Sequence, residues 1–460
     1  MQRVLTRLRS RRLLAASTGS LESLKNAPEA VAASAPAKWW QREPEKDGLV
    51  RLDSGEVCSV YLGFDPTADG LHVGHLVGLM ALRAFQKEGF RPIALLGGAT
   101  GMIGDPSGRS TERPMLDREA AHANAMGLLL DIERLLDFKA GEPNSAILVN
   151  NLDWYAPMSV FDFFAEVGHN FRVSAMMSRE SVKARLGDGT DSAHEGLSFT
   201  EFAYQIFQGY DFWHLYQSKG CCVQLGGSDQ WGNIASGLDL IRRMTPKDTV
   251  SDAIGVTVPL LTNRAGEKFG KSAGNAVWLN PDKTSDFEFY QFFLRVEDEM
   301  VEELLYKLTE LPVEDISGIV EAHNAAPEKR DAQRRLAQSV TEMVRGKASV
   351  HRAEVATQAL FGGDLDALTA DDLLSIDMPR VTLQGDQVQG RSVVDLFVAA
   401  KAVKSKGEAR RLASSGGLYV QNKRITDANL IIDLAEHATE GRVILIRSGK
   451  QKYTVVSIEA

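Results

Sequence analysis

Residues 59–75 read SVYLGFDPTADGLHVGH, and this stretch decides the fold. It opens with an apolar run typical of a buried strand, a polar turn follows, and the apolar pattern that begins at Leu76 predicts a helix. A strand, a turn and a helix in succession form the unit from which parallel sheets covered by helices are built. We therefore predict an α/β fold.

Two histidines, His72 and His75, stand where the turn meets the helix. They could be metal ligands, a catalytic base with its partner, or groups that hold a phosphate. A helix amino terminus offers free N–H groups and partial positive charge, which favours a phosphate. A zinc site needs more ligands, and the metalloprotease pattern needs a glutamate that this stretch lacks. Isolated histidines are more often packed or solvated, so the pair alone leaves these readings open.

The strand pattern recurs three times after this stretch. RPIALLGG (91–98), SAILVNN (145–151) and CCVQLGG (221–227) read as buried strands, and polar or Gly-rich stretches follow them. Ligands of such sheets bind beyond the carboxyl ends of the strands. We predict a Rossmann-like catalytic domain with a parallel sheet over residues 36–283.

The remainder of the chain changes character twice. Residues 284–361 are rich in helix formers and predict a helical domain, and the acidic, Gly- and Pro-punctuated residues 362–390 suit a linker. Residues 391–460 predict a small α+β domain, with a short helix closed by Gly416 or Gly417 and a hairpin turning at Gln421-Asn422. Its basic residues suit an RNA backbone, although such surfaces are often only solubilising. The candidates for RNA binding are Lys404, Lys406, Arg410, Arg411, Lys423 and Arg424.

The composition is that of a globular protein, with 44% hydrophobic and 25% charged residues and a net charge of −9. No apolar run is long enough for a membrane span. The three cysteines fit neither a disulfide framework nor a paired zinc site, so apolar packing is expected. Residues 1–35 carry five arginines by Arg12 and no acid before Glu22, which is typical of a mitochondrial transit peptide. A disordered basic tail is the alternative, and either reading excludes this segment from the fold.

Two further stretches carry chemistry. In EKFGKS (267–272), two lysines and a serine beside a glycine could close over a triphosphate, or could form a solvated loop. The segment from Ser198 predicts a helix with a capping-box start at Ser198 and Glu201. Tyr204, Gln208 and Asp211 share one face of it, which could simply be exposed to solvent. The opposite face would carry Phe199, Phe202, Ile206 and Trp213.

HVGH and KFGKS, in this order around a Rossmann-like core, resemble the two signature motifs of class I aminoacyl-tRNA synthetases. With YLGFDPTADGLHVGH, GGATGMIGDPSG, SFTEFAYQIFQGYDF and QLGGSDQWGN, the chain resembles the tyrosyl-tRNA synthetases of the bacterial and mitochondrial type from about residue 50 to its end. The resemblance implies activation of L-tyrosine by ATP with Mg²⁺, followed by transfer of the tyrosyl group to tRNA(Tyr) for mitochondrial translation. It also implies a homodimer in the mitochondrial matrix, no tightly bound protein metal and no membrane.

The resemblance also implies roles for individual residues. Asp211 and Tyr61 would meet the phenolic OH of tyrosine. Asp105, Tyr204 and Gln208 would hold its ammonium group, and Gln230 and Asn151 would lie near its carboxylate. The ATP side would use the following residues: Gly63, Asp65, Thr67, His72 and His75 in the first motif, Gly227 and Asp229 near the ribose, and Lys268, Lys271 and Ser272 on the far side. Of these, His72, His75, Thr67, Lys268 and Lys271 would act in catalysis by stabilising charge on the phosphates.

Two positions depart from the pattern of the bacterial enzymes. Arg109 stands where a lysine is common, and Gly78 stands where a threonine is common. Arg109 keeps the charge, whereas Gly78 removes a side-chain contact to the nucleotide. These changes concern ATP affinity rather than the reaction.

Two other functions compete with this interpretation. A small-molecule nucleotidyltransferase could use the HxGH site without tRNA, but it would lack KFGKS and the basic C-terminal unit. An RNA-binding protein, such as an intron-splicing factor on a synthetase fold, could have lost the activity, but the signature residues are intact.

Overall fold

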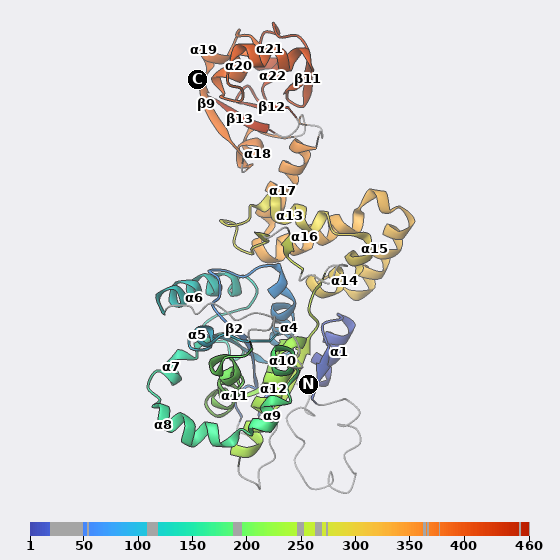
Figure 1. Ribbon diagram of the computed structural model, residues 1–460. Coiled ribbons are helices and arrows are strands. Elements are labelled where there is room, and N and C mark those ends of the chain that lie inside the picture. Colours follow the sequence, from blue (N-terminus) through green and yellow to red (C-terminus); the bar gives the residue numbers. More distant parts are fainter. Residues whose placement is uncertain are drawn as a thin grey trace. The chain divides into compact units, whose positions relative to one another are not determined.

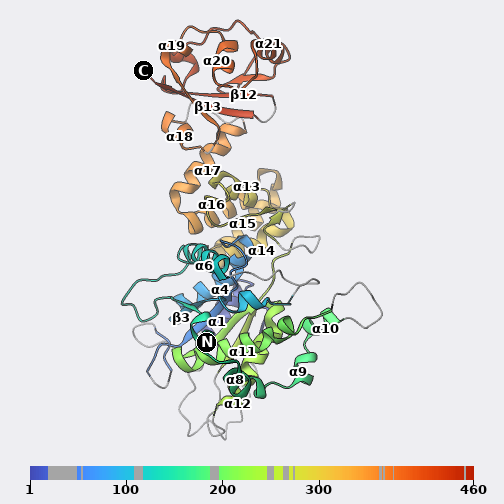
Figure 2. The same cartoon turned by 60° about the vertical axis from the view of Figure 1, so that its left-hand side comes forward.

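The computed structural model describes residues 1–18, 49–52, 55–107, 118–186, 196–245, 253–262, 269–272, 275–361, 365, 368–376, 378–449 and 452–459. These residues divide into two compact units (Figures 1 and 2). The first combines Met1–Asn280 with Val296–Ser339, and the second combines Pro281–Arg295 with Val340–Ala460.

A six-stranded sheet organises the first unit, in the order β1-β6-β5-β2-β3-β4. All neighbouring strands are parallel except β1, which is antiparallel to β6. The four strands predicted from the sequence are confirmed, whereas β1 and β6 were not anticipated. The strands are β1 (Ala16–Ser17), β2 (Ser59–Phe64), β3 (Arg91–Leu96), β4 (Ile147–Asn150), β5 (Cys221–Gly227) and β6 (Ile254–Val258).

Helices cover both faces of this sheet. Successive strand side chains point to opposite faces. Tyr61 lies against Phe212 of α11 (Phe199–Lys219), with ring centroids 5.4 Å apart, and α12 (Trp231–Met244) packs beside α11. The next residue, Leu62, points the other way and approaches Gly78 of α4 (Leu76–Lys87). The predicted α/β layering is therefore confirmed.

The start of α11 departs partly from the prediction. The Ser198 hydroxyl accepts a hydrogen bond from the Glu201 N–H at 3.3 Å, as expected for the cap. The Glu201 carboxylate, however, pairs with Arg185 at 2.9 Å, and both side chains are buried. Phe199 is 71% exposed, whereas Tyr204 and Asp211 are buried. The face with Tyr204, Gln208 and Asp211 is thus not a solvent-exposed one.

The N-terminal segment is part of the fold, so excluding it from the fold was wrong for residues 1–18; residues 19–35 lie outside the described residues. Helix α1 (Gln2–Ser10) buries Val4, Leu5 and Leu8 and contacts α4. Strand β1 then pairs with β6, Ala16 opposite Thr257. The alternation of apolar and basic residues that imitates a targeting signal also gives α1 one buried face and one charged face.

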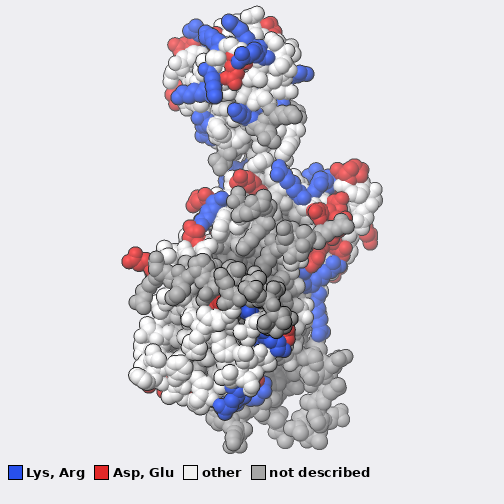
Figure 3. Space-filling model, in the orientation of Figure 1, with Lys and Arg blue, Asp and Glu red and all other residues white. Residues whose placement is uncertain are grey.

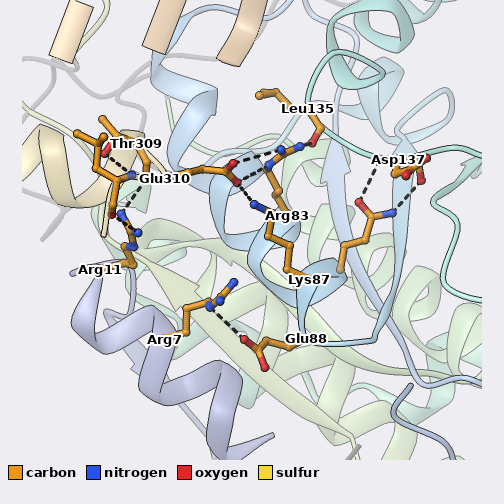
Figure 4. A network of polar contacts seen from close by, with 11 residues as sticks. Arg7, Arg11, Arg83, Lys87, Glu88, Leu135, Asp137, Thr309 and Glu310 are labelled. Carbon is orange, nitrogen blue, oxygen red and sulfur yellow. Dashed lines mark hydrogen bonds and ion pairs between the residues drawn. The ribbon is translucent and has the colours of Figure 1, made fainter. Parts of the chain in front are cut away.

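Polar contacts fasten this segment to two helices (Figure 4). Arg7 pairs with Glu88 at 3.0 Å. Arg11 donates to the carbonyls of Thr309, at 2.8 Å, and Leu311. These carbonyls follow the C-terminus of α14 (Asp298–Leu308), where a cation is favourably placed. The arginines therefore connect α4 with the end of α14.

The predicted helical domain is confirmed as helical, but it is divided between the two units. Residues 296–339, which include α14 and α15 (Val313–Ala325), cluster with the sheet. The flanking helix α13 (Asp286–Leu294) and helix α17 (Lys347–Leu360) cluster with the C-terminal residues. Helix α16 (Asp331–Arg345) spans the boundary.

The second unit contains a five-stranded sheet in the order β11-β10-β12-β13-β9. Residues 362–390 were expected to form a linker, and this is wrong for residues 370–376 and 378–390, which contain helices and a strand. There, β9 (Arg380–Gln384) pairs in parallel with β13 (Lys452–Glu459). Helix α18 (Ala370–Ser375) joins a core shared by α17, β12 (Val443–Ser448) and β13. The sharing of apolar side chains explains why this segment is ordered despite its Gly, Pro and acidic residues.

The predicted C-terminal helix and hairpin are confirmed. Helix α21 (Lys406–Ser414) ends before Gly416, whose φ is 66°. Strands β10 (Leu418–Val420) and β11 (Lys423–Ile425) are joined by Gln421 and Asn422, with φ of 48° and 60°. Positive φ at both positions is the signature of a type I′ hairpin turn. The remaining short helices of this unit are α19 (Gly385–Val388), α20 (Val393–Ala399) and α22 (Leu434–His437).

Candidate active site

The candidate site lies beyond the carboxyl ends of β2, β3, β4 and β5. Strand β2 has β3 on one side and β5 on the other. After β2 the chain adds β3 and β4 on one side, and it then crosses to the other side to form β5 and β6. Such a switch point is where open parallel sheets bind ligands. The side chains that meet here come from the turn after each strand and from α11.

Asp211 of α11 forms a buried carboxylate at one end of the site. One oxygen accepts a hydrogen bond from Asn151 Nδ2 and the other from Trp154 Nε1, each at 3.0 Å. Burial raises the pKa of Asp211 to about 7, although these two donors act in the opposite direction. Near neutral pH the carboxyl group is therefore poised between its protonated and ionised forms. This end of the site can accept a hydrogen bond from a hydroxyl group of a ligand.

Two polar atoms close to this carboxylate are buried with no hydrogen-bond partner among the described residues. They are the Tyr61 hydroxyl and Gln208 Oε1. The pKa of Tyr61 is raised by burial and then by the charge of Asp211. Buried polar groups are rarely left unpaired because each costs about 1–3 kcal/mol. A polar ligand would supply the partners that both atoms need.

Two further carboxylates line the middle of the site. Asp65 accepts from the Thr100 hydroxyl at 2.8 Å and from the Tyr204 hydroxyl at 3.0 Å. Asp105 accepts from Gln230 Nε2 at 2.8 Å. Burial raises the pKa of Tyr204, and the charges of Asp65 and Asp105 raise it further. This negative region suits a cationic group such as an ammonium ion.

The two signature stretches are brought together at the backbone. The Val73 N–H donates to the Val277 carbonyl at 2.9 Å, and the Leu279 N–H donates to the Leu71 carbonyl at 2.8 Å. Gly270, with a φ of 88°, lies so close that a Cβ there would stand 3.1 Å from the Gly74 nitrogen. Residues 269–272 and 275–279 therefore include the backbone that packs directly on the HVGH turn.

The histidines organise that turn themselves. His72 Nδ1 accepts from the Gly74 N–H at 3.0 Å, and His75 Nδ1 accepts from the His72 N–H at 3.1 Å. Their ring centroids are 4.1 Å apart at the start of α4, where η2 (Val73–His75) leads into the helix. With its Nδ1 accepting, a neutral His72 ring carries its proton on Nε2. His75 Nδ1 also lies 3.3 Å from the His72 carbonyl oxygen, so either tautomer of His75 fits these contacts. The His72 ring can therefore donate to an anion at the helix amino terminus.

The other predicted residues fall as follows. Gly63 and Thr67 are exposed at the end of β2, and a Cβ at Gly63 would meet open space. Gly227 ends β5 and Asp229 lies in η5 (Ser228–Gln230). Lys271 and Ser272 form the short strand β7, which pairs with β8 (Asn275–Ala276), while Lys268 and Arg109 lie outside the described residues.

At Gly78, the departure from the bacterial pattern is matched by a neighbour. A Cβ at this position would stand 3.0 Å from Leu62 Cδ2. The Leu62 side chain therefore occupies the space next to the helix where a larger residue at 78 would begin.

Asn151 lies in an unexpected place. The resemblance placed it at the carboxylate end of the substrate, but its amide bonds Asp211, the residue expected at the phenol end. Three contacting residues, Trp154, Thr100 and Asn233, were not singled out from the sequence. All three lie in the polar stretches after predicted strands. That position was the only feature of the sequence that could have indicated a place in the site. Asn233 Nδ2 reaches Gln230 Oε1 at 3.2 Å.

The basic C-terminal residues all lie on the surface, in α21, β11 and the turn before α21. Several blue side chains are visible on this unit in Figure 3. Arg424 donates to the carbonyls of Ser415 and Gly416 at 3.0 Å, and Lys406 pairs with Asp395 at 2.6 Å. These two residues therefore also have structural partners. Lys404, Arg410, Arg411 and Lys423 are exposed.

Neither a metal cluster nor a spanning helix is found in the described part of the chain. Its His, Cys, Asp and Glu side chains form no group of three that could hold a metal ion. No helix within these residues is both long and apolar enough to cross a membrane. The three cysteines are free and buried, as expected.

Comparison with known proteins defines the class. Residues 53–362 match the family of class I tRNA synthetases (W and Y), which is more than half of the chain. Residues 372–456 match the SYY-like C-terminal domain of tyrosine--tRNA ligases. The parallel sheet with HVGH at its switch point is thus that of a class I aminoacyl-tRNA synthetase.

Individual relatives show which family within this class the chain resembles. The chain is 42% identical to the tyrosine--tRNA ligase of Roseiflexus castenholzii over 90% of its length and 96% of the relative's. Identity to the enzyme of Geobacillus stearothermophilus is also 42%, over 90% of this chain and 95% of the relative's. A truncated mitochondrial tyrosyl-tRNA synthetase of Aspergillus nidulans is 30% identical, with a TM-score of 0.63, over 78% of this chain and 94% of that one. The chain belongs to the tyrosine--tRNA ligase family.

Proposed function

We propose that the chain binds L-tyrosine with its phenol at Asp211 and its ammonium group at Asp105, Tyr204 and Gln208. The observation that carries this proposal is a buried pair of groups. Asp211 is held by two donors, and the Tyr61 hydroxyl has no hydrogen-bond partner among the described residues. A phenolic OH can donate to Asp211 and accept from Tyr61. The side chain of tryptophan or phenylalanine cannot do both.

The first reaction is attack by the tyrosine carboxylate on the α-phosphate of ATP, which yields tyrosyl-adenylate and pyrophosphate. No protein nucleophile takes part. The chain contributes by holding the two substrates together and by stabilising charge on the phosphoryl oxygens. His72 and His75 donate to those oxygens from the start of α4, and Gly63 leaves room for the nucleotide. Mg²⁺ would enter on the phosphates of ATP and neutralise part of their charge.

The exchange of pyrophosphate into ATP tests this step. Purified protein should catalyse the exchange with tyrosine and not with tryptophan. No exchange with tyrosine, or equal exchange with tryptophan, would overturn the assignment.

The second reaction transfers the tyrosyl group to the terminal ribose of tRNA(Tyr), with the basic C-terminal surface holding the RNA. Cutting the chain at residue 390 is a poor test, because β9 and the core shared with α17 would lose their partners. The exposed pair Arg410 and Arg411 offers a cleaner one. Changing both to Glu should reduce tRNA charging while exchange stays normal, and Lys347→Glu, at an 88% exposed position, is the matched control. Unchanged charging would refute this role.

The proposed homodimer is supported by an apolar surface near the pocket. Exposed apolar side chains gather on α8 (Val160–Asp162), on η3 (Phe163–Val167) and on α9 (Val173–Met177). Phe161 is 85% exposed and Val160 is 69% exposed. Monomeric proteins rarely leave such residues clustered in water. Phe161→Glu should shift the molecular mass in light scattering from dimer to monomer, and a monomeric wild-type protein would contradict the proposal. The side chains of the cluster are Val160, Phe161, Phe164, Val173 and Met177.

The mitochondrial matrix is the proposed compartment. Two solved relatives, from Coccidioides posadasii (32% identical, TM-score 0.60, 76% of this chain and 90% of that one) and Aspergillus nidulans, are mitochondrial enzymes. The acid-poor, basic residues 1–18 suit import as well as their place in the fold. Replacing Arg3 and Arg9 by Gln should reduce the mitochondrial fraction of a C-terminally tagged protein. Equal import of both proteins would argue against this role.

A further inference from the structure

Helix α6 (Arg118–Ile132) lies beside the loop that carries the HVGH motif. Three of its residues touch that loop, namely Asn124, Gly127 and Asp131. Their spacing of three and four residues places them on one face of the helix. None of them belongs to a motif that the sequence analysis singled out.

Each contact is made to the loop backbone. Asn124 Nδ2 donates to the Pro66 carbonyl at 2.8 Å. The Leu71 N–H donates to Asp131 Oδ2 at 2.7 Å, in a buried contact. Asp131 is only 1% exposed, and Leu71 directly precedes His72.

Gly127 contributes by its lack of a side chain. A Cβ at this position would stand 2.2 Å from the Asp69 carbonyl oxygen and 2.8 Å from the Asp69 carbonyl carbon. Both atoms belong to the backbone, so the loop itself would have to move. The helix and the loop are thus in contact at residues 66, 69 and 71, on both sides of the turn.

We propose that this face of α6 sets the position of the loop 65–72, and so of the groups that meet ATP. Asn124, Gly127 and Asp131 are positioning residues, because they act through the loop and not on the substrate. The inference rests on the proposed function, since the loop carries Asp65, Thr67 and His72. Tyrosine is held mainly from α11 and the turn after β4, so its binding should depend little on α6.

Gly127→Ala is the sharpest test. We expect kcat/KM for ATP in pyrophosphate exchange to fall by about 10- to 100-fold, since displacements near 1 Å cost this much. The dissociation constant of tyrosine should stay within about twofold of the wild type. The matched control is Gly318→Ala in α15, where a Cβ would meet nothing within 4 Å. It should leave both constants unchanged.

Variants at two further positions keep the proposal testable if Gly127→Ala fails to fold. Asp131→Ala should lower kcat/KM for ATP, and Asp131→Asn should restore most of it because Asn Oδ1 can still accept from Leu71. Asn124 is only half-buried, so Asn124→Ala should fold and lose about threefold to tenfold in the same constant. His122→Ala, at an exposed position of the same helix, is its control.

The outcomes separate this inference from the proposed function. If the wild-type protein exchanges pyrophosphate but Gly127→Ala and Asn124→Ala match their controls, the role of α6 is overturned. Parallel losses of ATP and tyrosine binding that follow the melting temperature would also overturn it, because they indicate a structural role alone. A wild-type protein without exchange would instead overturn the proposed function.

Discussion

The tyrosine end of the candidate site is formed mainly by side-chain contacts, whereas the nucleotide end is formed mainly by backbone contacts. At the tyrosine end, buried side chains hold one another, as Asn151 and Trp154 hold Asp211. At the nucleotide end, backbone contacts backbone, as Val277 and Leu279 hydrogen-bond to residues of the HVGH turn and the loop before it. The first arrangement reads the chemistry of one amino acid, and the second provides a surface for phosphates that many ligands share. Truncating a side chain should therefore reduce activity most at the tyrosine end. At the nucleotide end, replacing a glycine by a larger residue should reduce activity most.

Asp211→Ala should have the largest effect. It removes the acceptor for the phenolic OH and leaves the buried donors of Asn151 and Trp154 unpaired. We expect kcat/KM for tyrosine to fall on the order of 10²- to 10³-fold, and selectivity over phenylalanine to fall with it. The measurement is pyrophosphate exchange with each amino acid. Asp153→Ala, which removes an exposed carboxylate nearby, is the control, and unchanged selectivity in Asp211→Ala would mean that the pocket is elsewhere.

Gly270→Ala tests the backbone contact at the other end. The residue has a positive φ, so alanine costs about 1–2 kcal/mol in strain, and its Cβ would also press on Gly74. We expect exchange to slow by about 10- to 100-fold, with tyrosine binding unchanged. Gly346→Ala has a similar φ of 86° but meets open space, so it should lower only the melting temperature. Equal exchange rates in the two variants would show that the close approach is unimportant.

The sequence predicted which residues lie in this site, but it did not predict all of the contacts between them. Strand patterns located the loops, because the polar residues after parallel strands must meet at one edge of the sheet. Periodicity placed Tyr204, Gln208 and Asp211 on one helix face, but could not say that Asn151 would bond Asp211. Such contacts join residues about sixty positions apart, and only packing decides them.

Local composition also misled in two places. The basic residues near Arg7 suggested a cleavable or disordered tail, but partners such as Glu88, far along the chain, make the segment part of the fold. The acidic residues before β9 suggested a linker, but β13 supplies a strand partner. In both cases the missing information was a distant partner and not a local preference.

The pH dependence of tyrosine binding should separate the two ends further. The pKa of Asp211 is raised to about 7, mainly by burial, so its carboxylate forms as the pH rises through 7. Tyrosine affinity should therefore increase over this range and fall by up to about tenfold per unit below it. Trp154→Phe keeps an aromatic ring on His214 but removes a donor to the carboxylate. It should move the midpoint upward by about one unit, as measured by equilibrium binding.

A control for this shift is Trp213→Phe, which changes a tryptophan on the same helix as Asp211 and leaves the donor of Trp154 in place. A midpoint that stays near 7 in Trp154→Phe would mean that the indole does not stabilise the carboxylate.

Tyr61→Phe should have the smallest effect, and an effect of opposite sign on stability and on binding. The Tyr61 hydroxyl is buried without a partner in the described part of the chain, so its removal should leave the empty protein as stable or more stable by about 1 kcal/mol. Tyrosine binding should weaken by about threefold to tenfold, because the phenol loses one partner. Tyr290 is also buried, but its hydroxyl lies 3.4 Å from Glu354 Oε1, so Tyr290→Phe should destabilise the protein. Denaturant unfolding of both variants would show the contrast, and a marked loss of stability in Tyr61→Phe would mean that the hydroxyl has a partner in the empty protein and is not reserved for the substrate.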